Sequence, residues 1–210
     1  MNYKIWFGND VAVSPVIGVM LMLVVTIIIA ALVSTFAGSL TGGTDQACPS
    51  ASIDVKINTG ADNGMGGTQP EITFEMLSGD PIPTKNLKII TTYINNTHFG
   101  YITNHTISSP KTLLYIGSYY GDSYARLPYL NDASKVGNAG SSNFADYGNF
   151  TWATGGIMCA QGKQQVSNFL GFANNTGYMD PDFGPGSSVD VEIIHIPSKM
   201  SMYEKEVTVL

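Results

Sequence analysis

The sequence predicts an α+β protein, in which one long N-terminal hydrophobic helix precedes an antiparallel β-sandwich or a small β-barrel. Three observations support this fold class. Residues 11–44 carry no charge and contain an almost purely apolar run. The later part of the chain alternates apolar and polar residues in short segments. Turns rich in Gly, Asn, Asp and Pro separate these segments.

The apolar run covers residues 16–37, which is about 33 Å of α-helix at about 1.5 Å per residue and long enough to cross a bilayer. Ser14 is a good N-cap and Pro15 a good first helical residue, so we expect the helix to begin there. Val, Ile and Leu occupy all its faces, so it must be buried all round by lipid or by neighbouring helices. Gly18 and Ala31 allow such helices to approach closely.

Three interpretations of the first 40 residues remain open. A secretory signal peptide needs a positive leader and a shorter apolar core, whereas this leader carries only Lys4, offset by Asp10. A permanent membrane anchor is the second interpretation. In the third, a hydrophilic leader, residues 1–12, is removed by cleavage between Ala12 and Val13, and the helix stays on the mature protein.

The third interpretation rests on a resemblance. Residues 12–36 open with Ala-Val-Ser-Pro-Val-Ile-Gly and end at Phe36, and they closely resemble the N-terminal segment of archaeal type IV pilins. Looser similarities to the globular part of that family occur at residues 78–83 and 183–186. One position departs from the family pattern, because Val11 stands where family members usually carry a charged residue before the cleavage site.

The resemblance implies a structural subunit, not an enzyme, that polymerises with copies of itself into an extracellular filament for adhesion or surface contact. The implied precursor lies in the cell membrane, where a prepilin peptidase removes the leader. An assembly ATPase with its membrane platform then moves the helix into the filament on the cell surface. The implied filament-core residues are apolar or small: Val16, Ile17, Gly18, Leu21, Val24, Ile28, Ala31 and Phe36. The alternative is a membrane-anchored extracellular binding domain that does not polymerise.

The rest of the chain is expected to form one β-rich extracellular domain. The helix occupies residues 13–40, a linker residues 41–47 and the domain residues 48–210. Alternating apolar residues predict strands at 52–58, 71–76, 87–94, 112–120, 189–196 and 202–210. The segment 87–94 is apolar on both faces, which suits a central strand, and the last two segments suit a hairpin. We expect no amphipathic helix after the linker.

The composition excludes several functions. The net charge is −6 and the chain has no basic run, so nucleic-acid binding is not expected. The chain lacks the common nucleophile, phosphate-loop, dinucleotide and zinc-protease motifs, so we expect no catalytic residue, cofactor or metal. The carboxylates of Asp180, Asp182, Asp190 and Glu192 do not follow the spacing of an EF-hand calcium loop.

Two covalent modifications suit an exported domain. Disulfides persist outside the cell, so a Cys48–Cys159 bridge is expected, with two buried free thiols as the alternative. Asn-x-Ser/Thr sequences make four asparagines candidate N-glycan acceptors: Asn95, Asn104, Asn149 and Asn174.

Overall fold

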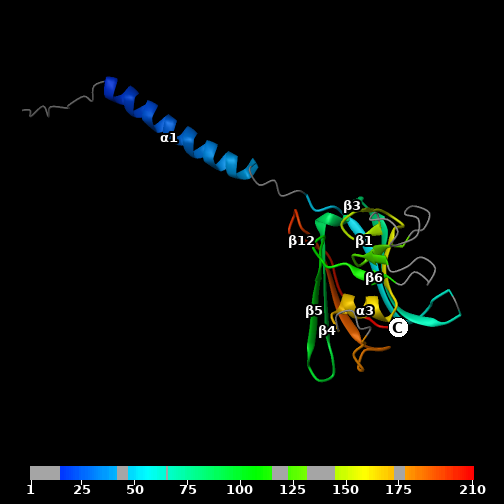
Figure 1. Cartoon of the computed structure of the whole chain (residues 1–210). Helices are drawn as coiled ribbons and strands as arrows, with labels where there is room; N and C mark the ends of the chain where they lie inside the picture. Colours follow the sequence, from blue (N-terminus) through cyan, green and yellow to red (C-terminus); the bar gives the residue numbers. More distant parts are fainter. Residues whose placement is uncertain (1–14, 42–46, 65, 115–122, 132–144, 173–177) are drawn as a thin grey trace, which may run out of the picture. The chain divides into compact units, whose positions relative to one another are not determined.

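The chain forms two compact units, Met1–Asp45 and Gln46–Leu210. The computed structural model describes residues 15–41, 47–64, 66–114, 123–131, 145–172 and 178–210, drawn in colour in Figure 1. Each unit is described by itself below.

The helices and strands of the described residues are as follows. The helices are α1 (Pro15–Thr41), α3 (Lys163–Leu170) and the short 3₁₀ turn η1 (Thr84–Asn86). The strands are β1 (Ala51–Asp62), β2 (Thr68–Gly79), β3 (Ile82–Pro83), β4 (Leu87–Ile94), β5 (Gly100–His105), β6 (Thr112–Leu114), β7 (Ser123–Ala125), β8 (Tyr129–Leu130), β9 (Thr151–Trp152), β10 (Ile157–Gln161), β11 (Ser188–His195) and β12 (Met200–Thr208).

The first unit contains the predicted hydrophobic helix. α1 runs for 27 residues from Pro15 to Thr41 without an acidic residue in its first turn or a basic one in its last. No residue of this helix carries a charge, so its sides offer no ion pair. The second unit has a hydrophobic core of its own.

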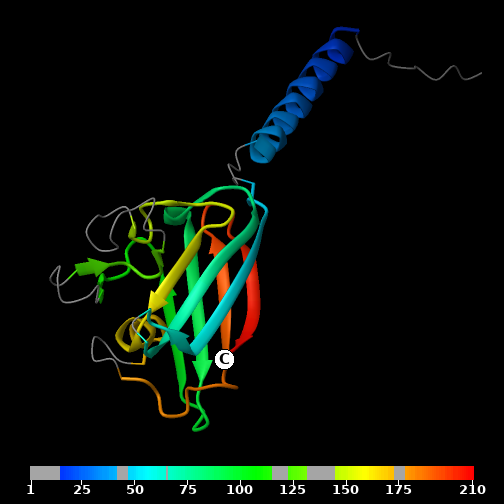
Figure 2. The same cartoon turned by 90° about the vertical axis from the view of Figure 1, so that its right-hand side faces the viewer.

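That second unit is a sandwich of two four-stranded sheets (Figures 1 and 2). One sheet has the strand order β1-β2-β10-β8 and the other β12-β11-β4-β5, and all paired strands within them are antiparallel. Small pairs β3-β9 and β6-β7 lie outside them. The sheets stay open, so the structure confirms the predicted α+β class and selects the sandwich over the barrel.

Cross-strand register aligns the apolar faces of β1 and β2. Ile53 lies opposite Met76, Val55 opposite Phe74 and Ile57 opposite Ile72. All six side chains are buried, whereas the residues between them are half-buried or exposed. Slipping this register by one residue would turn the whole apolar set outward, which is why the alternation specifies the pairing.

The second sheet also alternates buried and more exposed residues along its strands, and β4 lies in its interior. β4 pairs with β11 on one side and with β5 on the other, as the apolar character of residues 87–94 predicts. β11 and β12 form the predicted hairpin. Inward residues of the two sheets, including Ile89, Val191 and Phe74, belong to one continuous core.

The two lateral openings of the sandwich are closed differently. On one side β12 reaches β1: the Leu210 amide donates to the Ile57 carbonyl at 2.9 Å, and the Thr59 amide donates to the Leu210 carbonyl at 2.9 Å. On the other side α3 contacts β2 and β10 of one sheet and β4 and β5 of the other. Its Val166, Phe169 and Leu170 are buried in the core.

The expectation that no amphipathic helix follows the linker is wrong. α3 has only eight residues, and its buried Val166, Phe169 and Leu170 follow the i, i+3, i+4 spacing of a helix face. A lysine and two glutamines open this short helix, so its apolar spacing is too brief to stand out in the sequence. The strands β5 and β10 were also not predicted. Of the predicted strand 112–120 the structure describes only Thr112–Leu114, as β6.

A glycine at the end of β2 provides a test of this packing. Gly79 has φ +129°, and a Cβ there would lie 2.6 Å from the Ala51 Cα at the start of β1. We expect Gly79→Ala to lower the free energy of unfolding by about 2–4 kcal/mol through backbone strain and overlap. The measurement is urea denaturation of residues 46–210, since the core lies wholly within this unit.

Gly100 on β5 is the matched control, because a Cβ there would meet no atom within 4 Å. Gly100→Ala should change the free energy of unfolding by no more than about 0.5 kcal/mol. Equal effects of the two substitutions would contradict the close approach of Gly79 to β1.

Candidate assembly surface

The largest exposed apolar surface among the described residues is the whole circumference of α1. Its large apolar side chains are 44% exposed at Val25 and 71% exposed at Met22, the two extremes. The span Pro15–Phe36 has a mean hydropathy of 3.2 and no part of its most apolar window is buried. Its length and composition suffice to cross a membrane.

The hydroxyl groups along α1 do not interrupt this surface. Thr26 donates its Oγ1 hydrogen bond to the Leu23 carbonyl at 2.9 Å, and Thr35 donates to the Ala31 carbonyl at 2.8 Å. Each hydroxyl is thus satisfied by the backbone of its own helix. Neither needs water or a partner side chain, so the helix suits lipid and packed helices equally well.

The predicted filament-core residues lie on this surface. The predicted cleavage site lies outside the described residues. Val16, Ile17, Leu21, Val24, Ile28 and Phe36 are each more than half exposed, and Ala31 is exposed as well. A Cβ on Gly18 would meet nothing within 4 Å, so a neighbour has free access to its backbone. Ala12, Val13 and the cap Ser14 lie outside the described residues, and the helix begins at Pro15.

The expected Cys48–Cys159 bridge is not formed: both cysteines are free, Cys48 half-buried and Cys159 buried. Strand register explains why. Cys159 lies opposite Thr73 of β2, which lies opposite Lys56 of β1. β1 begins at Ala51, five residues and about 16 Å of strand before Lys56 at about 3.3 Å per residue, and Cys48 precedes that start. A disulfide needs Cα atoms within about 7 Å.

Cys159 is also a poor nucleophile. Burial raises the pKa of its thiol to about 12, so the thiolate is scarce at neutral pH. Its environment on β10 is part of the core that also holds Met158 and Ala160. The sulfur therefore acts as a small apolar group in the packing.

The four candidate glycan acceptors differ in their environments. The Asn95 Nδ2 donates to the Asp180 carboxylate at 3.1 Å, and its Oδ1 accepts from the Thr97 and Phe99 amides. Asn104 and Asn149 have exposed side chains. Asn174 lies outside the described residues. The amide of Asn95 is thus already engaged in hydrogen bonds with neighbouring residues.

Asp180 supports the tip of the β4–β5 hairpin. Its Oδ2 accepts from the Tyr101 hydroxyl at 2.8 Å as well as from Asn95, and its Oδ1 accepts from the Asp182 amide. Burial alone would raise the pKa of this carboxyl, but these hydrogen bonds outweigh it and lower the pKa. Among the described residues no group of three His, Cys, Asp or Glu side chains converges as a metal site.

A second buried acid, Asp146, was missed by the sequence reasoning. Its carboxylate is 1% exposed and lies 2.7 Å from the Lys111 Nζ and 3.7 Å from an Arg126 guanidinium nitrogen. Arg126 is the sole arginine of the chain, and its Nε donates to the Ser109 carbonyl. Removing either partner would leave a buried charge less compensated, so this pair ties the segment around β6 and β7 to the domain.

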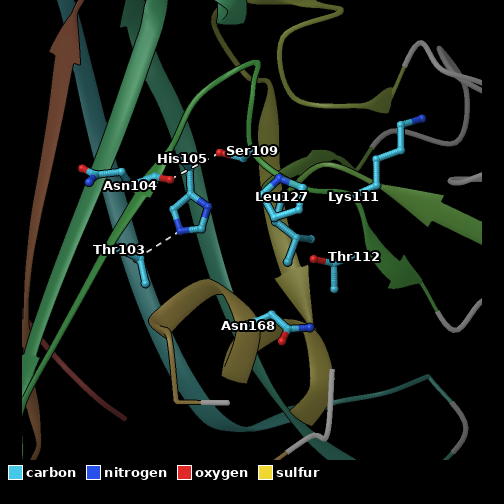
Figure 3. A pocket seen from close by; sticks show the side chains of 9 residues that line it. Thr103, Asn104, His105, Ser109, Lys111, Thr112, Leu127 and Asn168 are labelled. Carbon is cyan, nitrogen blue, oxygen red and sulfur yellow. Dashed lines mark hydrogen bonds between the residues drawn. The ribbon is translucent and has the colours of Figure 1, made fainter. Parts of the chain in front are cut away.

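A pocket of about 490 Å³ lies between β5, α3 and the segment 109–112 (Figure 3). His105, Lys111 and Asn168 are among its lining residues. His105 stacks on the Phe169 ring at 4.0 Å between centroids, and its Nε2 donates to the Phe169 carbonyl at 2.9 Å. Burial lowers the pKa of His105 to about 4. This imidazole is neutral and held by the backbone, which suits a structural role and not general-base catalysis.

His195 has a comparable role in the second sheet. It is buried at the end of β11, and its Nδ1 lies 2.8 Å from the Ser198 Oγ in the following turn. Burial lowers its pKa as well. Both histidines thus stabilise strand ends.

Comparisons with known proteins bear on the N-terminal part of the chain. Residues 11–53 match the sequence family described as archaeal type IV pilin, N-terminal. This match confirms the predicted resemblance to the archaeal type IV pilin family and supports a type IV pilin-like subunit. Members of that family are structural subunits.

One curated protein and the solved structures complete the comparison. An uncharacterized protein of Archaeoglobus fulgidus is 32% identical over 82 residues, which are 39% of this chain and 52% of that protein. The chain therefore spans about half the length of the curated relative it matches. No solved structure matches the chain significantly.

The buried His105 predicts how stability depends on pH. Its pKa is about 4 in the folded domain and 6.5 when exposed, so the unfolded chain binds the proton more readily between these values. The free energy of unfolding should therefore fall as pH drops from about 6.5 to about 4, by up to about 3 kcal/mol from this group. Urea denaturation of residues 46–210 between pH 4 and 8 measures the slope.

His105→Gln is the control, because glutamine can donate to the same carbonyl and does not titrate. The variant should lose most of the slope and keep only the part due to His195. A variant with the full wild-type slope would show that His105 is not the group responsible.

Proposed function

We propose that this chain is the structural subunit of an extracellular archaeal type IV pilus-like filament, which polymerises through α1 and serves adhesion or surface contact. The observation that carries the proposal is the uncharged helix whose apolar side chains are exposed on every face, in the segment that matches the pilin family. A self-contained β-domain follows it, with all its core residues between Ile53 and Val209.

The energetics of α1 support polymerisation. Fifteen large apolar side chains between Val16 and Phe36 are exposed. At about 1.5–3 kcal/mol each, their burial is worth at least roughly 20 kcal/mol relative to water. A subunit dissolved singly in water is therefore strongly disfavoured. The same surface is satisfied by lipid in a precursor and by neighbouring helices in a filament.

The spacing of the helix residues suits packing against copies of itself. Ile17, Leu21, Val24, Ile28 and Ala31 recur at intervals of four and three residues along one face of α1. The other faces are also apolar, so one helix can contact several neighbours at once. Because no acidic or basic residue is present on the helix, shape complementarity and not charge pairing sets the register between copies.

The proposed assembly has three steps. The precursor first lies in the cell membrane with α1 in the lipid. A prepilin peptidase then cuts between Ala12 and Val13 and leaves the helix on the mature subunit. An assembly ATPase and its membrane platform finally transfer the helix from lipid into the filament core, where helix contacts replace lipid contacts at small net cost.

The surface modifications follow from the exposure of the sequons. We propose that N-linked glycans attach at Asn104 and Asn149, which are exposed. Glycans at these two positions would increase the polar surface of the domain without disturbing its core. No enzymatic role is proposed, since the buried His105 and Cys159 serve packing.

The rival function is a membrane-anchored binding domain that does not polymerise. Both functions require the apolar helix in the membrane, so membrane insertion alone does not separate them. They differ in whether the helix also contacts copies of itself, and a charge in the middle of the helix separates them on that point.

Substitution of the middle of α1 tests polymerisation. Val24→Asp or Ile28→Lys would place an unpaired charge among packed helices, which costs several kcal/mol. We expect filament yield, normalised to processed subunit in the membrane, to fall at least about tenfold, since every 1.4 kcal/mol is a factor of ten. Normalisation is needed because the charge also costs about 2.5–3.5 kcal/mol on insertion. The readout is electron microscopy with quantification of sheared filaments.

Leu77→Lys is the matched control, because Leu77 is 51% exposed on β2 of the β-domain. This substitution adds a charge outside the helix and should leave the normalised yield unchanged. Wild-type cells that make no filament while the processed subunit is present would favour the non-polymerising anchor.

Processing gives an independent test. We expect the mature N-terminus at Val13, and we expect Ala12→Phe to accumulate uncut precursor in the membrane, because the peptidase requires a small residue at that position. Mass spectrometry of the extracellular protein identifies the terminus. A mature protein that begins after Ala37 would instead indicate a secretory signal peptide and would remove the helix from the filament.

A further inference from the structure

The outer face of the second sheet carries four carboxylates packed in two adjacent rows. Asp190 lies opposite Glu206 and Glu192 opposite Glu204, across the β11–β12 pair. We call these four residues the acidic face. Like charges placed directly opposite one another on neighbouring strands destabilise a sheet. Repulsion among these four carboxylates therefore lowers the stability of the sheet.

No cation of the described residues neutralises the acidic face through an ion pair. The described ion pairs join Lys56 to Asp54, and Lys111 and Arg126 to Asp146. Lys205 on β12 instead places its Nζ 5.9 Å from the centroid of the Tyr203 ring. The four carboxylates line a shallow pocket of about 480 Å³ together with Lys205 and with Ile90, Thr92 and Val191, so four acids and one lysine share this hollow and a side chain from outside has room in it.

Three lysines lie beyond the acidic face, toward the β11–β12 turn. Lys85 belongs to η1, and Lys88 lies opposite Ile194 on β11, two residues along that strand from Glu192. Lys199 is in the β11–β12 turn, which is joined to η1 by the bond from the Ile196 amide to the Asn86 carbonyl at 2.8 Å. We call these three lysines the basic end, and none of them forms an ion pair with a described carboxylate.

Lys199 has a left-handed backbone conformation, which is energetically unfavourable for a residue with a Cβ atom. Its φ is +57°, in the left-handed region that glycine or asparagine adopts more easily. The turn geometry alone would thus be served better by another residue. A lysine at this position adds a cation to the basic end at a conformational cost.

We propose that the basic end of one β-domain docks on the acidic face of the next copy in the filament, as a second contact beside the helix. This inference rests on the proposed function. The two surfaces are different parts of one chain, so the contact is heterologous and repeats without closing on itself. Every copy supplies both partners, and a filament built through α1 brings β-domains together at high local concentration.

The proposed contact has a defined salt dependence. Exposed charges interact over a Debye length of about 10 Å at 0.1 M salt and only about 3 Å at 1 M salt. The contact should therefore strengthen the filament at low salt and contribute little at 1 M. The apolar packing of α1 differs from this contact, because added salt does not weaken it.

Charge reversal in assembled filaments tests the contact. The measurement is the fraction of subunit that remains in sedimenting filaments after mild heating, at about 0.05 M and at about 1 M NaCl. Exposed charges interact over a longer distance at the lower salt concentration than at the higher one. At the lower salt, Lys199→Glu should reduce this fraction at least about threefold, because it turns attraction into repulsion. At 1 M NaCl the sedimenting fractions of the variant and of the wild type should be equal. Lys199→Glu combined with Glu204→Lys should recover most of the loss.

Lys163→Glu is the matched control, since it makes the same change of charge at an exposed position on α3, away from both surfaces. It should behave as the wild type at both salt levels. Equal behaviour of the Lys199 and Lys163 variants, or a double reversal without recovery, would overturn the contact while leaving the pilin proposal intact. Wild-type cells without filaments would overturn the proposed function and this contact with it.

Discussion

The burial demand of the uncharged helix α1 determines how the rest of this protein is organised. Its large apolar side chains are exposed on all sides, and the hydroxyls of Thr26 and Thr35 are satisfied by its own backbone. Such a helix is strongly disfavoured in water, and it carries no charged group. The β-domain is stabilised by a core of its own, and in the proposed assembly it folds independently of where the helix lies.

The β-domain meets this requirement by closing its sandwich on both sides. The C-terminal residues reach β1 through backbone hydrogen bonds, and α3 inserts Phe169 between strands of both sheets. These closures seal a core to which Phe74, Trp152 and Ile193 all belong. The histidines and the buried acid Asp146 serve the same purpose, since each is held by the backbone or by a nearby cation. The buried polar groups of the domain thus stabilise its fold.

The outer surface divides into regions of different charge, and this division has consequences for assembly. Carboxylates crowd one region of the second sheet and lysines lie at its end, on different strands and turns. In the proposed filament, packing of the apolar helices sets the register between copies of α1. In that filament, the proposed contact between complementary charges would add orientation to the β-domains and favour one partner over another.

The sequence by itself determined the helix, the strands β1 and β2, the β11–β12 hairpin, and the family resemblance of the N-terminal segment. Each depends on local periodicity: an unbroken apolar run of membrane length, or alternation that leaves only one register with Ile53, Val55 and Ile57 inside. Only the tertiary structure decided the closing helix α3, the ion pair of Lys111 with Asp146 and the separation of Cys48 from Cys159. These features join residues far apart in the chain, and their positions follow from how strands stack and register, which no short window of sequence contains.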